Sequence, residues 1–172
     1  NYPLSIIPLE VRLDDELYED NVTITPEEFY KKINSGMKPS TSQPSVGKIL
    51  EVYENLKAQG FERIVAFTVT SKLSGTYSSF TQASELIEGI DIKIIDTLQV
   101  ARIVGCAVEK IIKDFSNGNL AYENIEDECR KLLKQQNILV TIENMDFLYA
   151  GGRLTKTQFL LSNFLNILPI IT

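Results

Sequence analysis

Apolar runs alternate along the chain with segments whose apolar residues recur at helical spacing. The apolar runs predict five strands, at residues 4–13, 63–70, 91–97, 137–143 and 167–172. The helical spacing predicts intervening helices at residues 26–35, 44–59, 74–88, 98–117, 122–136 and 157–165, with a shorter one within 144–153. Strands that alternate with helices indicate an α/β fold in which helices flank a parallel sheet.

The domain organisation follows from the same pattern. Residues 1–136 carry the alternating strands and helices, so we expect them to form an N-terminal α/β domain. Residues 137–172 begin a new apolar set, and we expect the start of a second, incomplete α/β domain there. The chain opens without methionine and closes on an apolar strand pattern, which would leave an unpaired edge. We therefore expect it to be a fragment of a longer protein.

Composition excludes several functional classes. The net charge is −6 and no basic stripe is visible, which disfavours nucleic acid as a partner. The chain has no histidine, which removes Ser-His and Cys-His catalytic dyads and the usual zinc sites. Its two cysteines lack metal-ligand spacing, so no metal site is expected. The longest apolar stretch, 159–171, is short and interrupted by polar residues, so we expect no stable membrane insertion.

A first candidate site lies where the predicted strand 63–70 gives way to a helix, at Ser74-Gly75-Thr76. The first N–H groups of a helix have no internal partners, and the helix dipole is positive there. Glycine allows a ligand close to the backbone, and the Ser74 hydroxyl adds a donor. This loop could bind an anion. An ordinary helix cap formed by Ser74 explains the same residues equally well.

A second loop of this kind, Thr41-Ser42-Gln43-Pro44-Ser45, precedes the helix expected from Pro44. Helix capping is again an equal alternative. In a parallel sheet, two such loops from neighbouring strand–helix units can face one small anion. The local basic residues are Lys38 and Lys72, and no phosphate-binding lysine motif is present. This pattern favours a weakly charged group such as a carboxylate.

Four segments together, TSQPS at 41–45, SGTY at 74–77, IIDT at 94–97 and YAGGRLT at 149–155, resemble the DegV family of bacterial fatty-acid-binding proteins. The resemblance covers the whole chain. It implies a cytoplasmic two-domain α/β protein that has no cofactor and no catalytic residue. It implies a single bound long-chain fatty acid, such as palmitate, stearate or oleate. Thr41 and Ser74 would hydrogen-bond its carboxylate, and Gly75 would offer its backbone.

The resemblance also implies a partner and a pathway. The protein would be the binding subunit of a fatty acid kinase, and would present the fatty acid to an ATP-dependent kinase subunit that makes acyl phosphate for phospholipid synthesis. Arg153 of the GGR motif would lie near the carboxylate end or in the kinase-docking surface. The chain departs from the family pattern in lacking the initial Asp-Ser strand and the second half. Its Asp96-Thr97 stands where the family has Asp-Ser.

Three other functions remain open from the sequence. A serine hydrolase acting on acyl esters could use Ser74 or Ser71, but the nucleophile-elbow motif is absent and Lys72 is poorly placed as a base. A phosphate- or nucleotide-binding domain would use the same helix N-terminus, but no glycine-rich phosphate motif is present. The third alternative is an interaction module with an incidental pocket.

Overall fold

The computed structural model describes residues 4–142, 145–165 and 170–171, with only the backbone described for 161–165 and 170–171. The chain forms two compact units, the first from Asn1–Ile7 and Gln43–Gln136, the second from Pro8–Ser42 and Asn137–Thr172. Both the sequence-based division and the compact units separate Gln136 from Asn137. However, residues 8–42 group with the C-terminal segment rather than with the rest of residues 1–136. The assignment of whole domains stays a prediction.

The first unit is built on a parallel pair of strands, β4 (Arg63–Thr68) and β5 (Asp91–Asp96). Their register aligns Arg63 with Asp91 and Thr68 with Asp96. This pair and the helices around it confirm the predicted α/β fold with a parallel sheet. Both strands end earlier than the sequence pattern predicts, because their pairing stops at Thr68 and Asp96.

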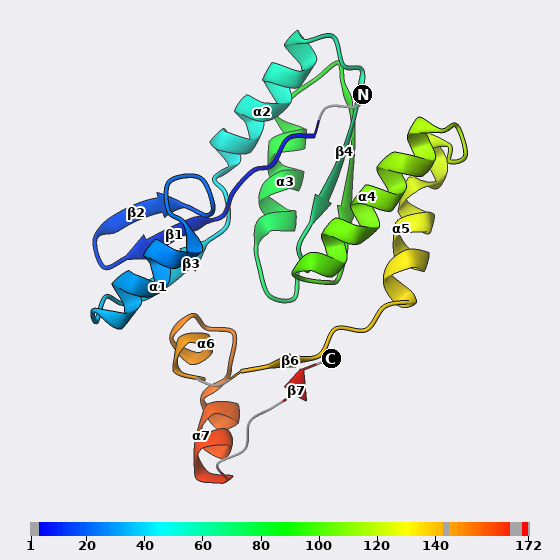
Figure 1. The fold of residues 1–172 in the computed structure, drawn as a ribbon. Helices are drawn as coiled ribbons and strands as arrows, with labels where there is room; N and C mark the ends of the chain where they lie inside the picture. Colours follow the sequence, from blue (N-terminus) through cyan, green and yellow to red (C-terminus); the bar gives the residue numbers. More distant parts are fainter. Residues whose placement is uncertain (1–3, 143–144, 166–169, 172) are drawn as a thin grey trace. The chain divides into compact units, whose positions relative to one another are not determined.

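Helices cover both faces of this strand pair (Figure 1). On one face, α2 (Val46–Ala58) and α3 (Thr76–Glu85) bury a cluster with the strands, made of Ile49, Tyr53, Ile64, Ala66, Phe80 and Ala83. On the other face lie α4 (Arg102–Ser116), the 3-10 helix η1 (Tyr122–Asn124) and α5 (Ile125–Lys134). Their cluster contains Ile95, Ile103, Ala107, Ile111, Ile125, Cys129 and Leu133. Alternate residues of the strands therefore serve two separate cores.

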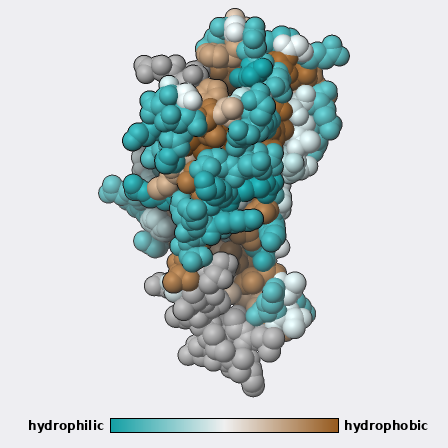
Figure 2. Space-filling view, turned by 90° about the vertical axis from the view of Figure 1, so that its right-hand side faces the viewer, coloured by the Kyte–Doolittle hydropathy of each residue, from teal (hydrophilic) through white to brown (hydrophobic). Residues whose placement is uncertain are grey.

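The outer surfaces of α4 and α5 are polar. On α5, Arg130 pairs with Glu126 at 2.7 Å and Lys131 pairs with Glu128 at 3.2 Å. Figure 2, which views the molecule from the side of these two helices, shows mostly hydrophilic residues with hydrophobic ones between them. This separation of faces is the amphipathic pattern that predicted α5 from the sequence. None of the helices in the described ranges is long and apolar enough to cross a membrane.

The N-terminal part of the second unit is a three-stranded antiparallel sheet in the order β2 (Glu16–Glu19), β1 (Glu10–Leu13), β3 (Pro39–Ser42). Helix α1 (Pro26–Asn34) packs its apolar side on this sheet around Val11, Leu13 and Ile24. Its start is the predicted one, because Thr25 and Glu28 form a reciprocal capping box. The prediction of a strand from residue 4 is wrong, since β1 begins at Glu10, and β2 and β3 were not predicted.

The C-terminal part of the second unit contains β6 (Val140–Thr141), α6 (Asp146–Ala150), α7 (Lys156–Leu165) and β7 (Ile170–Ile171). β6 and β7 form an antiparallel pair of their own. α6 and α7 contact each other through the stacked rings of Tyr149 and Phe159, whose centroids are 4.4 Å apart. The strands predicted at 137–143 and 167–172 are shorter where the structure describes them. Residues 143–144, 166–169 and 172 lie outside the described residues.

Replacing Tyr53 by phenylalanine is expected to stabilise the first unit. The Tyr53 side chain is buried against α3, its hydroxyl has no hydrogen-bond partner among the described residues, and burial raises the pKa of the phenol. A buried hydroxyl without a partner costs desolvation free energy, so its removal should raise the free energy of unfolding by about 1 kcal/mol. Urea denaturation measures the change. Tyr30→Phe, at an exposed tyrosine, is the control, and a destabilised Tyr53→Phe protein would contradict the expectation.

Candidate functional site

The loop between β4 and α3 is held in place by the end of β5. The N–H groups of Leu73 and Ser74 both donate to the carbonyl of Thr70, at 3.2 Å. The Asp96 carboxylate accepts from the N–H of Ser71 and from that of Leu98, at 3.1 Å each. The two loops that follow the parallel strands are thus tied to one carboxylate. This tie fixes the backbone leading into Ser74 and Gly75.

Ser74 is half-buried and lies just before the first turn of α3. Its Oγ accepts the N–H of Thr76 at 3.3 Å and lies 2.8 Å from Thr76 Oγ1. The N-cap position belongs to Gly75, and no side chain bonds to the helix from that position. The alternative in which Ser74 is the N-cap residue is therefore wrong, although Ser74 does satisfy one N–H of the first turn. The N–H groups of Gly75, Tyr77 and Ser78 have no acceptor among the described residues.

Thr41 lies in strand β3, where it pairs with Val11 of β1, and its side chain is exposed. The expectation that residues 41–45 form a loop entering a helix is therefore wrong for Thr41. The cap of α2 is Ser45, whose Oγ accepts from the N–H of Lys48 at 3.3 Å. Thr41 belongs to the second compact unit and Ser74 to the first. Their shared contact with one carboxylate stays a prediction.

Gln43 was not identified from the sequence, but its side chain lies against Gly75. A Cβ added to Gly75 would stand 2.8 Å from Gln43 Nε2, 2.9 Å from Cδ and 3.2 Å from Oε1. Both residues belong to the first compact unit. One indication in the sequence that Gln43 lies near the site is its position inside the TSQPS segment.

Arg153 follows α6 in an exposed turn of the second unit. Its Nη1 donates to the carbonyl of Gly151 at 2.6 Å, and its N–H donates to the carbonyl of Leu148 at 2.9 Å. Gly152 has a φ of +75°, which glycine adopts without strain. The GGR segment therefore makes a tight turn that ends α6. The predicted role of Arg153 at the carboxylate or in kinase docking stays a prediction.

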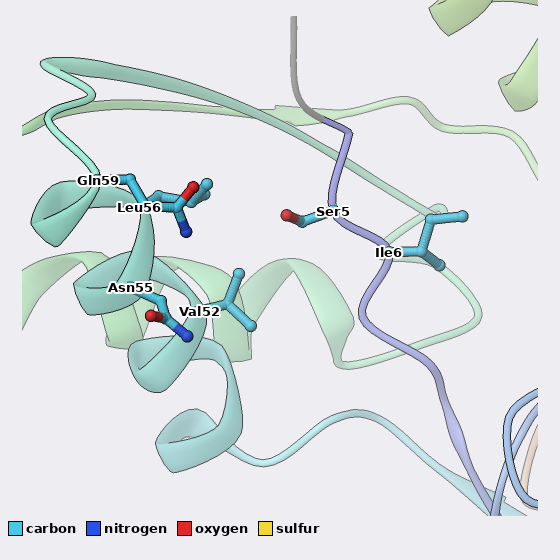
Figure 3. A pocket seen from close by; sticks show the side chains of 6 residues that line it. All are labelled: Ser5, Ile6, Val52, Asn55, Leu56 and Gln59. Atoms are coloured by element: carbon cyan, nitrogen blue, oxygen red, sulfur yellow. The ribbon is translucent and has the colours of Figure 1, made fainter.

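A hollow of about 290 Å³ lies between the N-terminal segment and α2 in the first unit. It is lined by Ser5, Ile6, Val52, Asn55, Leu56 and Gln59. In Figure 3, Ser5 points toward the side chains of α2, whereas Ile6 points away. The lining is mixed and includes neither Ser74 nor Gly75, and the volume is at the lower end of ligand pockets. This hollow does not belong to the candidate site.

A metal site and an activated serine nucleophile each require particular side chains close together. Within the described ranges, no group of three Asp, Glu or Cys side chains could hold a metal ion. The hydrogen-bond partners of Ser74 Oγ in those ranges are the N–H and the hydroxyl of Thr76. Neither group is a base that could activate a serine nucleophile. The arrangement instead offers donors to an anion.

Comparison with known proteins agrees with the resemblance in the sequence. The family model described as "Uncharacterised protein, DegV family" matches residues 1–172. A DegV domain-containing protein from Caldanaerobacter subterraneus is 33% identical over 171 residues, which are 99% of this chain and 60% of that protein. The chain therefore spans about 60% of the length of this curated relative.

Solved structures of fatty-acid-binding proteins share the fold. A fatty-acid-binding DegV family protein from Thermus thermophilus is 28% identical with a TM-score of 0.81, over 95% of this chain and 58% of that one. A stearic acid-binding protein from Eubacterium ventriosum is also 28% identical, with a TM-score of 0.76 over 90% of this chain and 56% of that one. The match of the family model over every residue shows that this chain belongs to the DegV family.

Proposed function

We propose that the chain binds a single long-chain fatty acid, whose carboxylate is held at the Ser74–Gly75 loop and by Thr41. The observation that carries this proposal is the family match over the whole chain, together with relatives of 28% identity described as binding fatty acids, one of them stearic acid. Palmitate, stearate and oleate are the ligands we expect.

The geometry around Ser74 supports the proposed carboxylate contact. A serine hydroxyl has one proton to donate and two lone pairs to accept. The lone pairs of Ser74 Oγ can take the N–H and the O–H of Thr76, at 3.3 and 2.8 Å. The Ser74 proton is then available for a ligand oxygen. The N–H groups of Gly75, Tyr77 and Ser78, which lack acceptors in the described part of the chain, add positive potential at the same place.

The two ends of the ligand contribute differently. Burying about 14 methylenes is worth up to about 11 kcal/mol, at about 0.8 kcal/mol each. Each hydrogen bond to the carboxylate adds about 1.5–3 kcal/mol. The tail therefore supplies most of the affinity, while Ser74 and Thr41 fix the position of the carboxylate.

In this proposal the protein is a carrier rather than an enzyme. Ser74 acts as a donor, because Thr76, its neighbour at 2.8 Å, is no base. The bound fatty acid is presented to an ATP-dependent kinase subunit, which transfers phosphate to the carboxylate and supplies acyl phosphate for phospholipid synthesis in the bacterial cytoplasm. Arg153, in its exposed turn, contributes near the carboxylate or to the kinase contact.

The direct test is native mass spectrometry of the purified full-length protein, followed by denaturing extraction. We expect one fatty acid per chain, either carried from the expression host or taken up after palmitate is added. The mass difference should match a free acid, because a carrier does not modify its ligand. A protein that carries no fatty acid and binds no added palmitate would overturn the proposal. Covalent acylation of Ser74 would favour a hydrolase instead.

A further inference from the structure

A side chain at position 75 would have no room, whereas the backbone conformation there would accept any residue. The φ of Gly75 is −76°, which is open to any residue. What excludes a side chain is the carboxamide of Gln43, since an added Cβ would stand 2.8–3.2 Å from three of its atoms. All three atoms are nearly equally distant, so the amide lies with its flat side against Gly75. The glycine therefore leaves room for Gln43.

The Gln43 carboxamide is also available to a ligand. No hydrogen bond joins it to another residue in the described ranges, and the side chain is exposed. It lies against Gly75, the N-cap residue of α3, which directly follows the half-buried Ser74 in the chain. An amide NH₂ is a neutral donor and can share an oxygen with a hydroxyl donor. Because Gln43 and Ser74 belong to the same compact unit, this neighbourhood needs no assumption about the second unit.

We infer that Gln43 is a further polar contact of the ligand carboxylate, and that Gly75 lacks a side chain in order to keep the Gln43 amide in place. The inference rests on the proposed function, because it names a residue of the same site. It goes beyond that proposal in making Gln43 a determinant of selectivity for an acid over a neutral lipid.

The test compares palmitate with 1-hexadecanol, a lipid of the same length without the charge, on the full-length protein stripped of lipid. Gln43→Glu keeps the shape of the side chain but places a second anion beside the carboxylate. We expect palmitate affinity to fall about tenfold or more and hexadecanol affinity to change less than about twofold. Gln43→Ala should weaken palmitate binding about three- to tenfold. Gln82→Glu makes the same charge change at an exposed position of α3 and should leave both affinities unchanged.

A second arm tests the link to Gly75. Gly75→Ala should displace the amide and weaken palmitate binding about as much as Gln43→Ala, but should add nothing in the Gln43→Ala background. A wild-type protein that does not bind palmitate would overturn the proposed function and this inference with it. Wild-type binding with an unchanged Gln43→Glu protein, or with equal losses for palmitate and hexadecanol, would overturn the inference alone. An equal cost of Gly75→Ala in both backgrounds would also overturn it.

Discussion

Replacing Ser74 by alanine is expected to weaken fatty acid binding by about 1.5–3 kcal/mol, or roughly ten- to a hundredfold in Kd. The half-buried Ser74 Oγ accepts the N–H of Thr76 and lies 2.8 Å from Thr76 Oγ1. When the Thr76 hydroxyl donates across that contact, the Ser74 proton is left for the ligand. Without that proton, a carboxylate at the loop loses one charge-assisted hydrogen bond. The measurement is a displacement titration with a fluorescent fatty acid on the full-length protein stripped of lipid.

Ser71→Ala is the matched control, because Ser71 is an exposed serine of the same loop. Its backbone N–H, which Asp96 accepts, is retained in the variant. Ser71→Ala should bind like the wild type. If Ser74→Ala binds like the wild type but melts at lower temperature, Ser74 acts only by satisfying the N–H of Thr76.

The same titration tests Thr41. If Thr41 and Ser74 donate to one carboxylate, Thr41→Ala should also weaken binding, and the double variant should depart from additivity because both groups share one partner. Additive losses would indicate two separate contacts with the ligand. Palmitate methyl ester, which keeps the tail and removes the charge, should bind more weakly than palmitate to the wild-type protein. Equal affinities would place the carboxylate elsewhere.

Helices were the most predictable part of the fold, because their signals are local. Thr25, Pro26 and Glu28 mark the start of α1 within four residues, and the structure forms the expected capping box. The apolar spacing of α2 and α5 likewise places Ile49, Tyr53 and Cys129 in the cores. These signals act over one or two helical turns, so no tertiary contact is needed to interpret them.

Strand pairing was much less predictable. β3 is Pro-Ser-Thr-Ser, which has no apolar alternation, and three of its four side chains are exposed. It is a strand because its backbone pairs with β1, more than 25 residues earlier in the chain. Such non-local pairing leaves no periodic trace in a polar segment. Thr41 was therefore expected in a loop.

Helix ends near the site also escaped prediction. The helix expected from residue 98 starts at Arg102, because Leu98 and Ala101 have φ values of +53° and +60°. Asp96 binds the N–H of Leu98 and so stabilises this non-helical loop. Leu86 falls within the helix predicted at 74–88, but α3 ends before it, at Glu85, and Leu86 is 65% exposed. In both places the local backbone conformation, rather than the apolar spacing, sets the helix end.

The residues of the candidate site were likewise predictable only where their signal is local in the sequence. Ser74 and Gly75 were identified because a strand, a small polar pair and a helix follow one another in the sequence. Gln43 was missed because its contact with Gly75 joins segments more than 30 residues apart. A sequence motif shows which residues recur together, whereas the reason for a glycine with an ordinary φ becomes visible only in three dimensions.

Replacing Ile95 by alanine is expected to lower the free energy of unfolding of the first unit by about 2–5 kcal/mol. Ile95 has no exposed surface and lies in β5, where it packs in the cluster with residues of α4 and α5. Removing three carbon atoms there loses transfer free energy and leaves a cavity, because helices on this face and the strand pair cannot close around it. Urea denaturation followed by circular dichroism measures the loss.

Ile6→Ala is the matched control, since Ile6 is 82% exposed and its truncation should change stability by less than about 0.5 kcal/mol.

The position of Ile95 in β5 also makes the Ile95→Ala variant informative about the candidate site. Asp96, its neighbour in β5, holds the backbone of both loops that follow the parallel strands. At urea concentrations where the Ile95→Ala protein is still folded, it should retain fatty acid binding, because the Asp96 contacts are unchanged. A stability close to that of Ile6→Ala would mean that β5 is not the centre of this core. Strong loss of binding in the still-folded variant would mean that the loop depends on the packing beneath it as well as on Asp96.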